Sequence, residues 1–122
     1  MDFYPTILEL AGLNQKPKQH LDGKSLVSAV SGKPAGDLDG RFLAWTYPHH
    51  HGSQHSPSNA IRLGDWKLIQ KTDEKTKPED QYELYNLADD IGESKDLAKS
   101  KPERTQKLAA QLKQWLDATS PK

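Results

Sequence analysis

The chain has 122 residues, of which 34% are hydrophobic and 28% charged, enough for one compact domain with some irregular segments. Basic and acidic residues each number 17, so no net charge favours nucleic acid or an anionic membrane as a partner. The absence of cysteine excludes disulfides, thiolate zinc sites and a cysteine nucleophile. No apolar run reaches the ~20 residues of a membrane span, and the first residues lack a signal-peptide pattern. We therefore expect either a cytosolic protein or a piece of a longer one.

The first third of the chain predicts two helices joined by polar loops. Residues 2–12 have the pattern of a helix that ends at Gly12. Apolar residues cover most of its circumference, so this helix requires a neighbour. A second, shorter helix is expected through Val30, with Asp22 as its N-terminal cap. Residues 31–40 are rich in glycine and form a connector.

The middle of the chain predicts a β-sheet. Ile61 and Leu63 alternate with Ala60 and Arg62, which indicates a sheet with one buried face. Only Gly64-Asp65 separates two of the strands, and a two-residue separation is a strong hairpin signal. About four strands are expected, at residues 41–47, 59–63, 66–70 and 81–87.

The clearest helix is the last one, which we expect to cover the sheet. Ser100 stands three residues before Glu103, as a capping box requires, and Pro102 falls in the first turn. One face of this helix is apolar and is formed by Leu108, Ala109, Leu112, Trp115 and Leu116.

The most promising functional feature is the histidine-rich loop after the first strand. His49, His50 and His51 follow Tyr47-Pro48, and imidazoles can bind a metal, relay a proton or bond an anionic substrate. A closed metal site would also need a carboxylate or thiol, and none lies between residues 45 and 58. Three interpretations stay open here: a metal site, an exposed polar loop and a substrate-facing loop.

Two further patterns have structural explanations that we favour. Residues 100–104 spell S-x-P-x-R, the pattern around the nucleophile of sulfatases, but 122 residues cannot supply the large domain that such a nucleophile needs. The same residues form a complete helix start. Trp45, Trp66 and Trp115 could stack on a sugar ring, but as large aromatics in strands and an amphipathic helix they are expected in the core.

The order of several segments resembles the C-terminal region of arylsulfatase-type sulfatases. Residues 2–13 and 21–26 are similar to the end of the catalytic domain, written D-x-x-P-T-L-L-D-L-A-G and D-G-x-S-L. Residues 45–49 resemble a W-x-Y-P-H strand end, residues 60–69 an A-I-R-x-G-x-x-K-L-I hairpin and residues 83–87 an E-L-Y-N-L strand. Thr46 departs from the pattern, because many relatives carry histidine there. The resemblance spans nearly the whole chain.

The resemblance implies an α+β fold: a four-stranded antiparallel β-sheet packed by a C-terminal amphipathic helix, with an additional N-terminal helix and long loops. Residues 1–40 would be the last helix and connector of the catalytic domain, and residues 41–122 the C-terminal subdomain. The parent enzyme would be a periplasmic or secreted sulfuric ester hydrolase that uses calcium and formylglycine. None of its catalytic or calcium-binding residues would lie in this chain.

The leading hypothesis is a sulfatase C-terminal fragment that is inactive alone and helps to form the substrate cleft. In the full enzyme, His49, His50 and His51 would approach a sulfated substrate, and the catalytic domain of the same polypeptide would be the main partner. Some self-association through the exposed first helix is expected. The alternative is a stand-alone interaction or assembly module with no link to catalysis.

Overall fold

The computed structural model describes residues 1–16, 18, 22–34, 36–38, 40–49, 57–77 and 80–119. The chain divides into two compact units, Met1–Arg41 and Phe42–Lys122. Among the described residues, no helix is long and apolar enough to cross a membrane.

The first unit is small and is held together largely by hydrogen bonds. The Thr6 hydroxyl accepts a hydrogen bond from the backbone N–H of Leu26 at 2.9 Å and donates one to the Asp2 carbonyl at 2.6 Å. These bonds fasten the first helix to the segment before the second helix. The helical elements are α1 (Phe3–Leu10), α2 (Val27–Val30) and the 3-10 helix η1 (Gly36–Leu38).

The expected cap of the second helix was wrong. α2 has a single turn, and Leu26, not Asp22, precedes it without a side-chain cap. The hydroxyl of Ser25 accepts a hydrogen bond from the N–H of Val27 at 3.2 Å. The backbone of Asp22 serves another purpose, because its carbonyl accepts a hydrogen bond from the Arg41 side chain at 3.0 Å.

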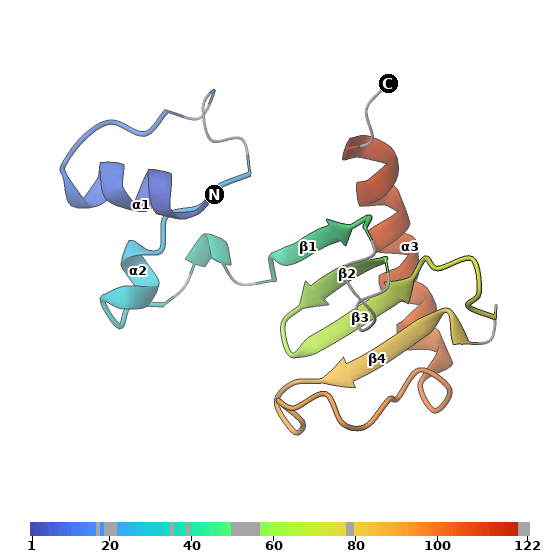
Figure 1. Ribbon diagram of the computed structural model, residues 1–122. Coiled ribbons are helices and arrows are strands. Elements are labelled where there is room, and N and C mark those ends of the chain that lie inside the picture. Colours follow the sequence, from blue (N-terminus) through green and yellow to red (C-terminus); the bar gives the residue numbers. More distant parts are fainter. Residues whose placement is uncertain are drawn as a thin grey trace. The chain divides into compact units, whose positions relative to one another are not determined.

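The second unit is a four-stranded antiparallel sheet with one long helix against it (Figure 1). The strands lie in the order β1-β2-β3-β4. This arrangement confirms the predicted α+β fold. The elements are β1 (Phe42–Tyr47), β2 (Ser58–Leu63), β3 (Trp66–Lys71), β4 (Tyr82–Asn86) and α3 (Pro102–Thr119).

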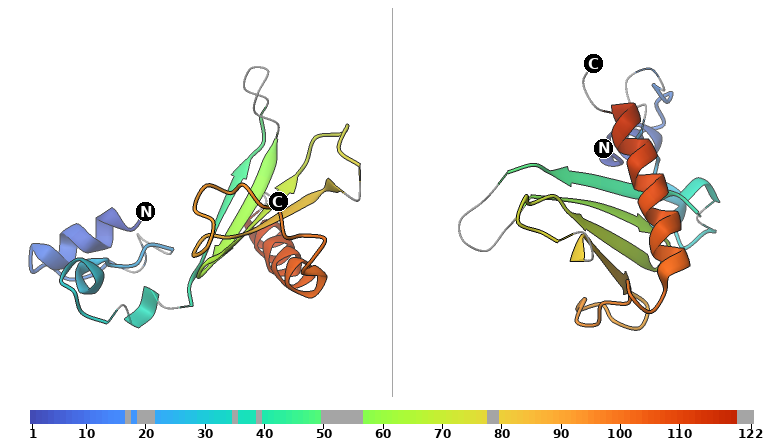
Figure 2. Two further views of the ribbon diagram at one scale, coloured as in Figure 1. Left: turned by 90° about the horizontal axis from the view of Figure 1, so that it is seen from below. Right: turned by 90° about the vertical axis from the view of Figure 1, so that its right-hand side faces the viewer.

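The core lies between the sheet and α3, which crosses one face of the sheet (Figure 2). Ile61, Leu68 and Leu84 are paired across β2, β3 and β4 and are fully buried. Leu108 and Leu112, one helical turn apart on α3, complete this cluster. The alternation predicted for Ile61 and the apolar face predicted for the last helix are both confirmed.

The start of α3 differs from the expected capping box. The helix begins at Pro102, so Ser100 lies two residues before it. The Ser100 hydroxyl donates a hydrogen bond back to the Leu97 carbonyl at 3.1 Å. Residues 100–104 nevertheless form a helix start, as predicted, with Pro102 at the first helical position.

The expected position of Trp45 was also wrong. On β1, only Ala44 packs against the core, because its neighbour in register is Ile61. Trp45 points to the opposite face of the strand and is 49% exposed. Trp66 and Trp115 are partly buried and pack against the core cluster, as expected.

Candidate functional site

The histidine-rich loop is the connection between β1 and β2. Tyr47 and Ser58 are the last paired residues of these two strands, so the hairpin itself holds both ends of the loop. Pro48 follows β1, and its ring removes a donor and restricts the backbone where the strand stops. His49 is exposed, whereas His50 and His51 lie outside the described residues.

An open groove of about 670 Å³ lies at the base of this loop. The sheet supplies one wall, the connection between β3 and β4 a second and the C-terminal half of α3 a third. Its volume is within the usual range for small-molecule sites. The lining residues are Thr46, Pro48, Pro57, Asn59, Thr72, Asp73, Glu74, Lys75 and Leu116.

A row of polar side chains runs across the sheet into this groove. Thr46, Asn59, Gln70 and Tyr82 occupy successive paired positions on β1 to β4. The Asn59 amide donates to Gln70 Oε1 at 3.0 Å, and the Gln70 amide donates to the Tyr82 hydroxyl at 3.4 Å. This chain of hydrogen bonds fixes the orientation of the Asn59 amide, which lines the groove.

Backbone hydrogen bonds hold the second wall of the groove in place. The N–H of Thr72 donates to the Pro57 carbonyl at 3.0 Å, which joins the end of β3 to the start of β2. The Asp73 carboxylate accepts a hydrogen bond from the N–H of Lys75 at 2.9 Å and so shapes the turn. This wall therefore presents two carboxylates and one ammonium group to the groove.

The groove has the chemistry of a binding surface. It offers an amide, hydroxyls and charged groups of both signs beside the apolar Leu116 and two prolines. Within the described ranges, no three His, Cys, Asp or Glu side chains are grouped closely enough to hold a metal ion. The described residues therefore do not fit the calcium ion that the sulfatase resemblance implies for the parent enzyme.

The sequence indicates the histidine-rich loop but not most of the residues that line the groove. The sequence predicts only a strand for Asn59, and it predicts no site for the segment after β3. Asn59 stands two residues before Ile61 on β2, and side chains at this spacing lie on the same face of a strand. The sequence could therefore have placed Asn59 on the face that carries the core. Nothing in the sequence indicated that residues 72–75 and Leu116 would meet there.

The fold and the sequence together define the class of protein as the sulfatases. The solved structure of Ps i-CgsB in complex with k-i-k-neocarrahexaose superposes on this chain with a TM-score of 0.68 and 25% identity, covering 93% of this chain and 23% of that one. The chain belongs to the family N-sulphoglucosamine sulphohydrolase, C-terminal, whose model matches residues 1–122. This confirms the predicted membership.

Curated relatives support the same assignment. A sulfatase of Formosa agariphila is 31% identical over 128 residues, covering 95% of this chain. Arylsulfatase K of Danio rerio is 31% identical over 121 residues, covering 98% of this chain. The chain spans 22% of the length of each of these two relatives.

Proposed function

We propose that this chain is the C-terminal part of a sulfatase, that it is inactive alone, and that its histidine-rich loop forms one wall of the substrate cleft in the full enzyme. The observation that carries the proposal is the open polar groove at the base of the loop, which has binding groups but no metal-binding cluster among its described residues. The calcium ion and the formylglycine would belong to the remainder of the polypeptide. The substrate would be a sulfate ester.

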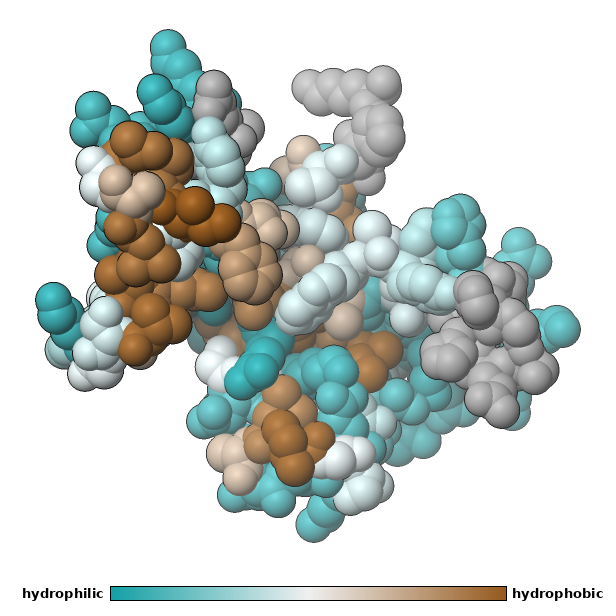
Figure 3. Space-filling model, turned by 60° about the vertical axis from the view of Figure 1, so that its left-hand side comes forward, coloured by the Kyte–Doolittle hydropathy of each residue, from teal (hydrophilic) through white to brown (hydrophobic). Residues whose placement is uncertain are grey.

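Exposed apolar side chains support the presence of a larger partner. On α1, Phe3, Ile7 and Leu10 lie on one stripe and are 75%, 62% and 67% exposed. In Figure 3 the largest group of apolar side chains lies on the left of the view. Such a patch is unusual on a soluble monomer and marks an interaction site. We propose that the catalytic domain of the same polypeptide covers it, and that residues 1–40 belong to that domain.

The sheet offers a second apolar surface on the side away from α3. Leu43, Trp45 and Tyr47 project from β1 to this side and are exposed. An edge strand with apolar side chains invites pairing or covering by another chain segment. The catalytic domain would cover this face in the full enzyme.

The parent enzyme would be periplasmic or secreted.

The first test measures sulfatase activity of the isolated chain. Incubation with 4-nitrophenyl sulfate and calcium should give no release of 4-nitrophenol above a blank. Turnover that scales with the concentration of the chain would contradict the proposal. The full-length enzyme, assayed in parallel, provides the positive control.

The second test addresses the loop within the full-length enzyme. Replacing His49, His50 and His51 by alanine should lower kcat/KM while leaving the thermal midpoint within about 2 °C, because His49 is exposed and none of the described core residues lies in the loop. The variant His20→Ala, outside the loop, is the matched control. Unchanged kcat/KM in the triple variant would rule out contact between the loop and the substrate.

A stand-alone interaction module is the second candidate, and the exposed α1 stripe is the observation that favours it. Under either function the isolated chain should self-associate, and serine at Phe3, Ile7 and Leu10 should make it monomeric in sedimentation. The two functions differ in the full-length protein. Sulfatase activity there would exclude a module with no link to catalysis.

A further inference from the structure

A second pocket lies at the other end of the sheet from the histidine-rich loop. It has a volume of about 280 Å³ and lies between the β2–β3 turn and the first two turns of α3. The loop ends at Ser58, the first residue of β2, whereas this pocket lies beside Leu63, the last residue of β2, about 17 Å away along the strand. The lining residues are Leu63, Trp66, Glu103, Arg104, Lys107 and Leu108.

Sheet register places Trp66 in this pocket. Trp66 pairs with Leu63 on β2, and both side chains lie on the face that α3 covers, as the buried Leu68 two residues later also does. The hairpin turn between them is tight, with Gly64 at a φ of +60°. An indole and two leucine side chains therefore form an apolar floor beside the helix.

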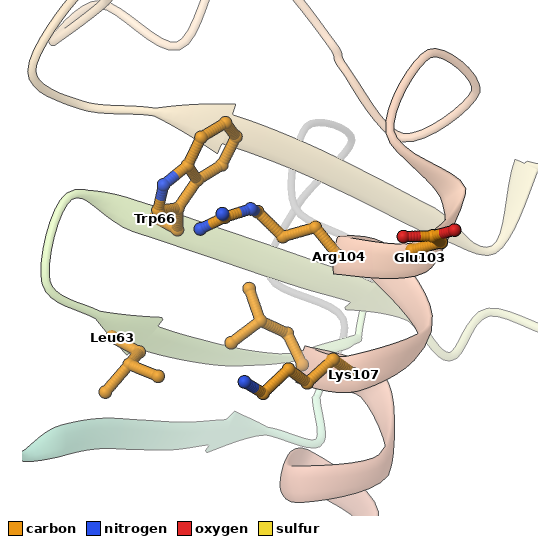
Figure 4. Close-up of a pocket in the computed structure, with 6 residues that line it drawn as sticks. Leu63, Trp66, Glu103, Arg104 and Lys107 are labelled. Atoms are coloured by element: carbon orange, nitrogen blue, oxygen red, sulfur yellow. The ribbon is translucent and has the colours of Figure 1, made fainter.

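Basic side chains from the start of α3 lie over this floor. The Arg104 guanidinium stacks on the Trp66 ring with Cζ 4.3 Å from the ring centroid, and Lys101 Nζ lies 5.9 Å from the same centroid. Figure 4 shows Arg104 and Lys107 extending from the helix toward Trp66 and Leu63. Stacking uses the face of the guanidinium and leaves its N–H edge available for a ligand.

The cations of this cluster have no acidic partner among the residues that the structure describes. Lys101 directly precedes α3, and Arg104 and Lys107 follow at intervals of three residues, so each cation lies near the next and repels it. In the part of the chain that the structure describes, none of the three forms an ion pair with a carboxylate. Among the described lining residues, Glu103 alone is acidic, and its carboxylate lies well apart from Trp66 (Figure 4).

We propose that this pocket is an accessory binding site for one sulfated sugar ring of an oligosaccharide. Arg104 and Lys107, the two cations that line the pocket, would bind the sulfate group through charge-assisted hydrogen bonds, and the apolar floor would contact the ring. A pocket of this size accepts one ring and not a broad macromolecular surface. The choice of a sulfated sugar rests on the proposed sulfatase function. The site would hold a part of the substrate distant from the cleft.

The test follows the indole N–H signal of Trp66 in ¹H–¹⁵N spectra of the 122-residue chain, assigned with Trp66→Phe. Titration with N-acetylglucosamine 6-sulfate should move this signal saturably, and unsulfated N-acetylglucosamine should not move it. Arg104→Gln should weaken binding by about tenfold or more. Lys113→Gln, on the same helix but paired with Asp117, should bind as the unmodified chain does.

The variant Glu103→Gln distinguishes a direct effect on binding from an effect of misfolding. Removing the Glu103 carboxylate from the pocket should strengthen binding several-fold, a direction that a damaged fold would not produce. No movement of the Trp66 signal, or binding that survives Arg104→Gln with Lys107→Gln, would overturn the proposal. Inorganic sulfate binding as tightly as the sulfated sugar would also overturn it, since the sugar ring would then contribute nothing.

Failure here is distinguishable from failure of the proposed function. If the full-length protein hydrolyses sulfate esters and the Trp66 signal does not respond, the accessory site is wrong and the sulfatase assignment stands. If the signal responds and the full-length protein has no sulfatase activity, the binding site stands and the assignment falls.

Discussion

Asp2 and Arg41, at opposite ends of the first unit's sequence, form an ion pair with Oδ1 2.9 Å from Nη2. The same carboxylate oxygen accepts a hydrogen bond from the backbone N–H of Lys24 at 3.0 Å. Burial works to raise the pKa of Asp2, but the hydrogen bonds from Arg41 and Lys24 and the charge of Arg41 outweigh it and lower that pKa below its usual value. One carboxylate thus joins three segments of the unit.

Asp2→Asn should loosen the first unit and remove the contribution of Asp2 to its sensitivity to acid. The lowered pKa of the folded state means that the stabilisation is fully present above the unfolded pKa, about 3.9, and is lost as the pH falls through the folded value. Hydrogen exchange of the Lys24 amide measures this. Its protection should decrease by about 1 kcal/mol in the variant at pH 7.

The control for that prediction is Lys99→Ala, which breaks an exposed ion pair with Asp80. This substitution should leave Lys24 protection unchanged, because both partners lie in the second unit and in solvent. Equal Lys24 protection in Asp2→Asn and in the unmodified chain would contradict the role assigned to Asp2.

Gly23→Ala should displace the first residues of the chain. A Cβ atom at Gly23 would lie 2.7 Å from the Met1 carbonyl oxygen, closer than any normal contact. The backbone must shift, and the neighbouring Lys24–Asp2 hydrogen bond should weaken by about 1–3 kcal/mol, measured by exchange of the Lys24 amide. Gly92→Ala, where the nearest atom is 3.9 Å away, is the tolerated control.

Leu112→Ala should destabilise the second unit by about 2–5 kcal/mol, because it leaves a cavity between α3 and the sheet. Leu84→Ala, from the opposite wall of the same core cluster, should have an effect of similar size. Urea denaturation followed by circular dichroism measures both. Ile91→Ala is the control: this side chain is 81% exposed, so its loss should cost less than about 0.5 kcal/mol.

Tyr85 should ionise well above the usual tyrosine range. It is 7% exposed, and burial, followed by the neighbouring carboxylates of Glu83, Asp96 and Glu93, raises the pKa of Tyr85 to about 12. Because the folded pKa exceeds the unfolded value of about 10, its stabilisation is present below pH 10 and is lost as the pH rises toward 12.

Absorbance of the phenolate near 295 nm, recorded during a pH titration, checks the Tyr85 prediction. The signal should include one component that appears only near pH 12, and Tyr85→Phe should remove that component. A full tyrosine titration complete by about pH 11 would contradict the expected shift.

The sequence determined the type and order of the elements in the second unit. Gly64-Asp65 lies between two runs with the composition of strands and so specified the β2–β3 hairpin. Two strands joined by only two residues pair as antiparallel neighbours. The alternation around Ile61 and the spacing of Leu108 and Leu112 specified which faces are buried. Both signals are local, so they are readable without knowledge of the fold.

Only the tertiary structure decided which residues meet across the chain. Ser100 had the composition of a cap, but its hydroxyl bonds to Leu97 because the helix starts two residues later. Arg104 stacks on Trp66 because α3 crosses the sheet at that point, and no local pattern specifies such a crossing. The groove beside the histidine-rich loop likewise forms from four separate stretches of the chain. Secondary-structure propensity and hydrophobic periodicity are properties of a few neighbouring residues. These contacts depend instead on how helices and strands that are far apart in the sequence pack together.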